Sequence, residues 1–83
     1  MSTETLAETE VAQFLAGGPT PEEILAFHAS PEVNERMYEL IDRERDEHIT
    51  EEERQELESY MYMEHLMRLI KAEAHRKLGQ QAS

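Results

Sequence analysis

Cysteine is absent from this 83-residue chain, and glycine and proline occur only three times each. Without cysteine, the chain has neither disulfide bonds to stabilise a small core nor thiolates to hold zinc. No apolar run approaches the ~20 residues that a membrane-spanning helix needs. Residues 1–16 also lack the basic-then-apolar order of a signal peptide. We therefore expect a soluble, cytoplasmic protein that does not act in a membrane.

Positive charge is scarce as well. The chain has 19 acidic and 8 basic residues and a net charge of −11, which disfavours direct binding to nucleic acid, because phosphates require a basic surface. Residues 1–35 contain seven glutamates and no lysine or arginine, whereas residues 59–83 contain two glutamates and four basic residues. This asymmetry suits a basic protein partner or antiparallel self-association, although such charge also serves solubility alone.

Patterns that carry catalysis are missing too. The four histidines are His28, His48, His65 and His75, and no two of them stand three or four residues apart on one helix, as a two-histidine metal site requires. There is no glycine-rich phosphate loop and no serine in a nucleophile elbow. A chain this short is also expected to lack a water-excluding pocket. We expect neither an enzyme nor a bound cofactor.

What the chain does contain is helix-forming residues almost throughout, with no sustained alternation typical of strands. The pattern predicts a single all-α domain, with two short N-terminal helices followed by a helical hairpin whose second helix is long. The expected helices cover residues 3–16, 20–28, 31–45 and 50–78, and Gly79 is expected to end the last one before a frayed tail, 79–83.

Local signals support the early boundaries. Gly17 and Gly18 can adopt the positive φ angles that end a helix. Thr20 and Glu23 have the spacing of a capping box, in which each side chain bonds the other residue's amide. Ser30, directly before a proline, fits the N-cap of the third helix.

Apolar residues of the last two helices follow helical spacing. The third helix carries one stripe, made of Val33, Met37, Leu40 and Ile41. The long helix carries an apolar belt, which we define as Leu57, Tyr60, Met61, Tyr62, Met63, Leu66, Met67, Leu69, Ile70 and Ala74. The belt is wider than the ~100° stripe of an ordinary surface helix, so part of it needs cover from the N-terminal helices or from a second molecule.

A homodimer or a complex with another protein is therefore expected. A domain of this size buries only ~60% of its unfolded surface, which leaves a thin margin of stability and favours association. The residues predicted to form the partner or dimer interface are Tyr60, Met63, Leu66, Met67 and Ile70.

The turn before the long helix has two interpretations. Residues at the ligand spacing of a calcium-binding loop are Asp42, Glu44, Asp46, Thr50 and Glu53. Against calcium, Glu47 stands where the sharp turn of such a loop requires glycine. The simpler interpretation is a turn followed by a capping box between Thr50 and Glu53.

Residues 34–74 carry a pattern that is shared with a group of other proteins. The matching residues are Glu35, Arg36, Glu39, Leu40, Ile49, Thr50, Glu52, Glu53, Glu56, Leu57, Tyr60, Glu64, His65, Leu66, Met67, Leu69, Lys71 and Ala72. With this pattern the chain resembles a group of small bacterial all-helical proteins, which are themselves similar to antitoxin-like companions of larger proteins. The resemblance implies no particular activity. Its members often carry a glycine where this chain has Glu47 or His48.

Three functions follow as hypotheses. The first is an acidic helical protein–protein interaction module, in its most concrete form an antitoxin-like or inhibitory partner of a basic protein. The second is a calcium-responsive helical pair that uses the 42–53 turn. The third is a purely structural subunit of an assembly.

Overall fold

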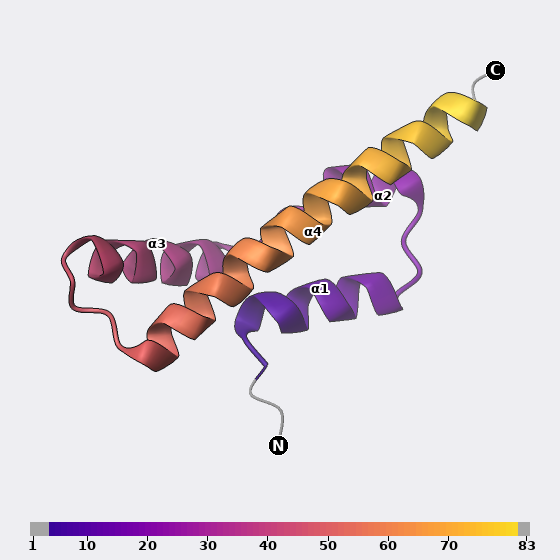
Figure 1. Ribbon diagram of the computed structural model, residues 1–83. Helices are drawn as coiled ribbons and strands as arrows, with labels where there is room; N and C mark the ends of the chain where they lie inside the picture. The colour runs from indigo at the N-terminus through magenta and orange to yellow at the C-terminus, as the bar shows by residue number, and fades with distance from the viewer. Residues whose placement is uncertain (1–3, 82–83) are drawn as a thin grey trace.

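The computed structural model of the protein describes residues 4–81, and within this range it contains four helices and no strand. Helix α1 is Leu6–Ala16, α2 is Pro21–Ala26, α3 is Pro31–Arg45 and α4 is Glu51–Gln81. The all-α prediction is thus confirmed. The molecule is elongated, with extents of 52 × 28 × 18 Å, because α4 runs through its whole length (Figure 1).

Three helices begin with the same device, a threonine and a glutamate three residues apart. In each pair the threonine hydroxyl accepts a bond from the glutamate amide, and the glutamate carboxylate accepts one from the threonine amide. The pairs are Thr5 with Glu8, Thr20 with Glu23, and Thr50 with Glu53. Ser30 caps α3 by accepting a bond from the Val33 amide at 3.3 Å. The predicted caps at residues 20, 30 and 50 are confirmed.

The turn between α3 and α4 ends α3 with a Schellman motif. The amide of His48 donates to the carbonyl of Arg43 at 2.8 Å, and the amide of Glu47 donates to the carbonyl of Glu44 at 3.1 Å. This pattern requires a left-handed residue after the C-cap, and Glu47 supplies it with a φ of 61°. The turn therefore holds a glutamate in a conformation that favours glycine.

The core lies where α3 and α1 pack on the first half of α4. Its buried members are Ala7, Val33, Leu40, Leu57 and Tyr60, and half-buried Met37, Ile41, Ile49 and Met63 pack against them. Leu40 is fully enclosed, at 0% exposure. The predicted stripe of the third helix is thus the face that α3 turns toward α4.

Outside this core, further contacts attach α1 and α2 to α4. The hydroxyls of Thr5 and Ser59 lie 2.9 Å apart, which ties the start of α1 to α4. Phe27, the C-cap of α2, stacks on Phe14 of α1 with ring centroids 4.5 Å apart. Lys71 of α4 donates to the carbonyl of Phe27 at 2.8 Å. The contacts of Phe27 with Phe14 and Lys71 thus join α1, the end of α2 and α4 at one point.

Several predicted boundaries differ from the structure. Helix α1 begins at Leu6, not near residue 3, because Thr5 is its cap; residues 1–3 lie outside the described range. Helix α2 ends at Ala26, because Phe27 adopts an extended conformation. Gly79 does not end α4, which continues to Gln81. Glycine permits a helix end but does not enforce one, and no proline follows it.

None of the helices within residues 4–81 combines the length and the apolar character that crossing a membrane would take.

Candidate functional site

The predicted interface residues lie on the side of α4 that faces the rest of the chain. Tyr60 and Met67 are buried there, and Met63, Leu66 and Ile70 are half-buried. Tyr60 belongs to the core described above. The structure thus uses most of the predicted interface to pack α4 against its own neighbours.

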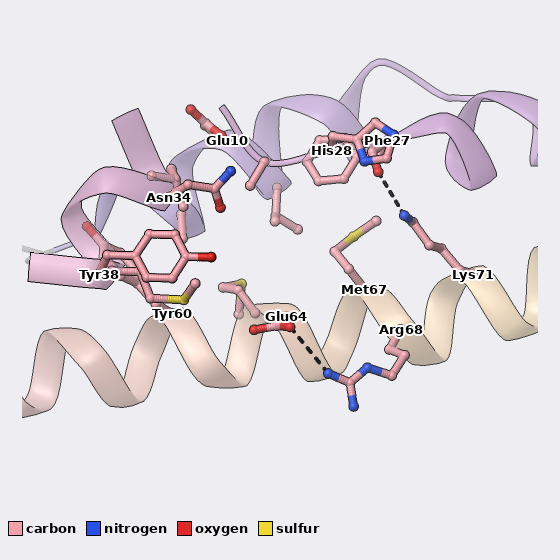
Figure 2. A pocket seen from close by; sticks show the side chains of 16 residues that line it. Glu10, Phe27, His28, Asn34, Tyr38, Tyr60, Glu64, Met67, Arg68 and Lys71 are labelled. Carbon is pink, nitrogen blue, oxygen red and sulfur yellow. Dashed lines mark hydrogen bonds and ion pairs between the residues drawn. The ribbon is translucent and has the colours of Figure 1, made fainter. Parts of the chain in front are cut away.

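Beside this packed face lies an open cleft, which sequence analysis did not expect in so short a chain. The cleft has a volume of about 440 Å³ and is bordered by α1, the segment after α2, α3 and α4. Figure 2 shows Tyr38 and Tyr60 toward one end of it and Phe27 and Lys71 toward the other. Cavities of this size are within the range that binding sites occupy.

Three methionine side chains line the cleft, Met37 from α3 and Met63 and Met67 from α4. Methionine is unbranched and polarizable, so such a lining adapts to apolar groups of different shapes. The aromatic ring of Tyr38 also lines the cleft and is 63% exposed. Among these side chains, the accessible apolar area of the cleft therefore comes from Tyr38 and from half-buried Met37 and Met63, because Met67 is buried.

Polar groups on the cleft lining are held by defined partners. The carboxylate of Glu10 accepts a bond from the Ser30 amide at 3.1 Å, and Arg68 donates to Glu64 at 3.4 Å. The ammonium group of Lys71 is occupied by the Phe27 carbonyl (Figure 2). His28 also lines the cleft and is exposed.

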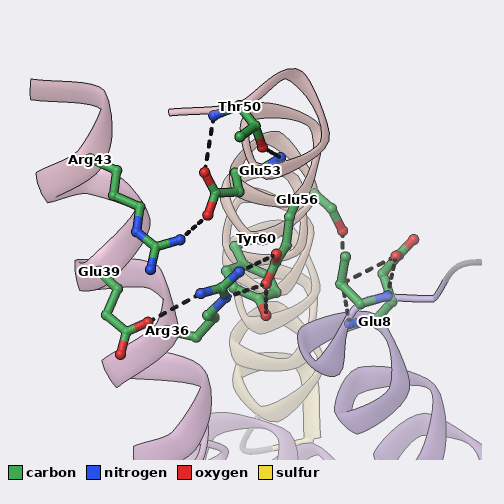
Figure 3. A network of polar contacts seen from close by, with 10 residues as sticks. Glu8, Arg36, Glu39, Arg43, Thr50, Glu53, Glu56 and Tyr60 are labelled. Carbon is green, nitrogen blue, oxygen red and sulfur yellow. Dashed lines mark hydrogen bonds and ion pairs between the residues drawn. The ribbon is translucent and has the colours of Figure 1, made fainter. Parts of the chain in front are cut away.

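A polar network fastens α3 to α4 next to the cleft (Figure 3). Arg36 binds Glu56 through two bonds, from Nε at 2.9 Å and from Nη2 at 3.0 Å. Tyr60 donates its hydroxyl hydrogen to the same carboxylate at 2.8 Å, and Arg36 also reaches Glu39 at 3.1 Å. Bidentate, charge-assisted bonds of this kind are among the strongest that side chains make.

The network shifts the ionisation of its members. The bonds from Arg36, aided by Tyr60, hold the pKa of Glu56 below its ordinary range against the opposing effect of burial. Burial, together with its bond to Glu56, raises the pKa of Tyr60 to about 12. The pKa of Arg36 is raised chiefly by Glu56. The structure thus favours an anionic Glu56, a neutral Tyr60 and a cationic Arg36.

The arginines are neutralised within the chain. All six of them, Arg36, Arg43, Arg45, Arg54, Arg68 and Arg76, form ion pairs with carboxylates of the same chain. In contrast, none of the seven glutamates from residue 4 to residue 35 has an ion-pair partner within the described residues. Uncompensated negative charge therefore concentrates on α1, α2 and the start of α3.

Part of the apolar belt faces away from the other helices. Met61, Tyr62 and Leu69 are 58%, 61% and 53% exposed. Leu69 also borders a hollow of about 320 Å³ between α4 and α2. The prediction that α4 carries more apolar width than its own chain covers is consistent with these exposures.

The five residues proposed for calcium do not form a cluster. Glu53 accepts bonds from the Thr50 amide and from Arg43, while Asp42 pairs with Arg45 at 3.8 Å. Glu44 lies within 4.0 Å of Arg54. In the part of the chain that the structure describes, no three histidine or acidic side chains gather in an arrangement that could hold a metal ion. The turn is built as a helix end followed by a capped helix.

The four histidines are all exposed and lie on different segments. His28 is in the α2–α3 connection, His48 is in the turn, and His65 and His75 are on α4. The cleft could not be predicted from the sequence because its walls come from four separate segments, and no local spacing brings Glu10, Met37 and Met67 together. The only available signal was the methionine content.

Searches of family models, of curated proteins and of solved structures each returned no match for this chain.

Proposed function

We propose that the protein is a small helical interaction module that binds a cationic segment of a partner protein in the cleft between α1, α3 and α4. The observation that carries this proposal is the combination of an apolar, methionine-lined cleft with a surface whose uncompensated charge is negative. The two features serve different steps: charge accelerates encounter, and apolar contact provides affinity.

The pairing of the arginines determines where the negative charge of the surface is uncompensated. Because each of them is occupied by a carboxylate of its own chain, the formal charge of −11 is expressed mainly by glutamates of α1, α2 and the start of α3. Such a surface repels phosphates and attracts lysine and arginine. A basic protein segment therefore fits better than a nucleic acid.

The lining of the cleft indicates which form of ligand it can bind. Methionine-lined grooves accept the apolar face of an amphipathic helix, whose anchors recur every three or four residues. Half-buried Met37 and Met63 are available for such anchors. Glu10 adds a carboxylate without an ion-pair partner among the described residues, whereas Glu64 is paired with Arg68. An inhibitory companion that covers the cationic face of an enzyme, in the manner of an antitoxin, is the most concrete version of this function.

The proposal can be tested with two synthetic helical peptides of identical apolar spacing, one rich in lysine and one rich in glutamate. Methyl-labelled methionine gives a direct readout by NMR, because Met37, Met63 and Met67 line the cleft while Met61 lies on the exposed face of α4. We expect the lysine-rich peptide to shift the three cleft methyls, to leave Met61 unchanged, and to bind more weakly as salt increases.

A matched pair of variants completes the test. Asn34 is exposed and lines the cleft, so Asn34→Trp should fill it and abolish the peptide-induced shifts without unfolding the chain. Glu52→Trp, at an exposed position of α4 that does not line the cleft, is the control. Equal binding of the two peptides, shifts confined to Met61, or no binding of the lysine-rich peptide at millimolar concentration would contradict the proposal.

A further inference from the structure

The exposed side of α4 carries a second regular pattern beside the packed one. Its residues are spaced alternately four and three apart, the spacing of the contact positions of a coiled coil. We call them the outer seam: Glu58, Tyr62, His65, Leu69, Ala72 and Arg76. We propose that the outer seam binds the outer seam of a second copy of the chain, with the two α4 helices antiparallel.

All six residues of the outer seam are exposed. Helices α1 and α3 contact α4 through other residues: Ser59 bonds α1, and Glu53 and Glu56 bond α3. Helix α2 lies beside one end of the seam, where Leu69 borders the hollow between α4 and α2. Figure 1 shows α4 as a long rod with the three shorter helices distributed beside and behind it. A second rod can therefore approach along the outer seam without displacing α1 or α3, and it passes beside α2 at Leu69.

The outer seam is complementary to itself in one antiparallel register. When the two helices cross level with Met67, Tyr62 faces Ala72 of the second copy, and His65 faces its Leu69. Each large side chain thus meets a smaller or apolar one. Glu58 then faces Arg76 of the second copy, so acid meets base at both ends of the seam.

The available charges support this register. Glu58 has no ion-pair partner within residues 4–81, and Arg76 is 61% exposed at its side chain while it pairs with Glu73. A parallel arrangement would instead place Glu58 against Glu58, Tyr62 against Tyr62 and Arg76 against Arg76. Because like charges directly opposed are unfavourable, the antiparallel arrangement is preferred.

The seam is short, which limits its strength. From Glu58 to Arg76 it extends over about five turns, or ~27 Å. His65 occupies a central contact position, and a polar residue there lowers the stability of a coiled coil while it fixes the register. We therefore expect a reversible dimer whose formation depends on concentration.

Sedimentation equilibrium of the full chain from roughly 1 µM to 1 mM should show a monomer–dimer equilibrium. Leu69→Glu and Ala72→Glu should each abolish the dimer, with circular dichroism confirming that helicity is retained. His65→Leu should tighten it, because an apolar residue then occupies the centre of the seam. A chain that stays monomeric at ~1 mM overturns the proposal.

The register is tested by exchanging the charges. Glu58→Arg alone and Arg76→Glu alone should each weaken dimerisation about tenfold or more, because like charges then face each other. The double variant should restore it. Failure of the double variant to recover the wild-type dissociation constant would exclude this register.

Orientation is tested with single cysteines, which are unambiguous because the natural chain has none. A mixture of Tyr62→Cys and Ala72→Cys should form a mixed disulfide on mild oxidation, while neither variant alone forms one efficiently. If each variant instead links to itself, the helices are parallel and the proposal is wrong. Asn34→Trp, which fills the cleft, should leave the dimer unchanged, so that failure of the cleft hypothesis and failure of this one are distinguishable.

Discussion

The packed and exposed sides of α4 have a similar spacing of apolar residues, but only those of the packed side are buried. On the packed side, Leu57, Tyr60, Met67 and Ala74 are buried by the other helices. On the exposed side, Tyr62 and Leu69 follow an equally regular spacing and remain more than half exposed. Periodicity therefore shows that a face is suited to contact, but it does not show which molecule provides the contact.

Composition separates the two sides where spacing does not. The buried residues of the packed side, from Leu57 to Ala74, are apolar, and Tyr60 is satisfied through Glu56. The outer seam is apolar only in its middle and carries Glu58 and Arg76 at its ends. A continuous apolar face suits a permanent core, whereas a short one with charged ends suits reversible association.

The largest difference between the two sides should appear when apolar side chains are truncated. Leu40→Ala, which removes a fully enclosed side chain from the packed side, should lower the free energy of unfolding by about 2–5 kcal/mol. Leu69→Ala should change it by no more than about 0.5 kcal/mol at concentrations where the chain is monomeric. Urea denaturation followed by circular dichroism measures both. Comparable losses would show that α2 covers Leu69 more tightly than its exposure indicates.

Glu56 and Glu58 provide the same comparison for charged residues. Glu56→Gln disrupts bonds to Arg36 and Tyr60 and should lower the free energy of unfolding by about 1.5–3 kcal/mol. Glu58→Gln, two residues along the same helix, should have an effect within about 0.5 kcal/mol. If the two substitutions are equivalent in urea denaturation, the network contributes nothing beyond its solvated charges.

The network should also make stability depend on pH. The pKa of Glu56 is lower in the folded chain than its ordinary value of 4.5, so the unfolded chain binds the proton more readily. The stabilisation is therefore complete above about pH 4.5 and is lost as the pH falls through the folded-state pKa. Unfolding measured between neutral and acidic pH should show a decline that Glu56→Gln reduces and Glu58→Gln does not.

At alkaline pH the free energy of unfolding should change in the opposite direction, falling as the pH rises. Because burial raises the pKa of Tyr60 from 10.0 to about 12, the unfolded chain loses this proton first, and stability should fall as the pH rises above 10. Tyr60→Phe removes that dependence and also the bond to Glu56. Thermal unfolding of the two proteins across this range isolates the contribution of the hydroxyl. A fall of the same size in Tyr60→Phe would assign it to other groups.

The smallest expected effect concerns the turn that places α3 against the packed side. Glu47 has a φ of 61°, so Glu47→Gly should raise the free energy of unfolding by about 1 kcal/mol. Asp46→Gly is the control, because Asp46 has a negative φ and gains nothing from glycine. Neither substitution should alter self-association through the outer seam. If Glu47→Gly does not stabilise the chain, its side chain makes a compensating contribution.

The helices were predictable because their ends are encoded locally. Threonine–glutamate pairs and Ser30 set the starts of α2, α3 and α4, and each device needs only residues within one turn. The same signal at Thr5 and Glu8 was present and overlooked. Gly79 was predicted to end α4, but a glycine ends a helix only when the following residues leave it, and here they continue the helix.

The site was less predictable, because it depends on contacts between distant residues. Tyr60 and Met67 were predicted to lie at an interface with another molecule, and the structure shows both of them buried within the chain. The bidentate pair of Arg36 and Glu56 spans 20 residues of sequence, and it depends on the angle at which the hairpin closes. The spacing of residues along a helix does not specify that angle.

Helix α2 has six residues, none of them buried. Its end is retained by Phe27, through the ring of Phe14 and the ammonium group of Lys71. Although α2 lies against α4, a six-residue helix with no buried side chain can detach while the α3–α4 core stays intact. Native-state hydrogen exchange should therefore find the α2 amides exchanging by subglobal opening, at denaturant concentrations too low to affect the amides around Leu40. Such an opening would widen access to the middle of α4 without unfolding the protein.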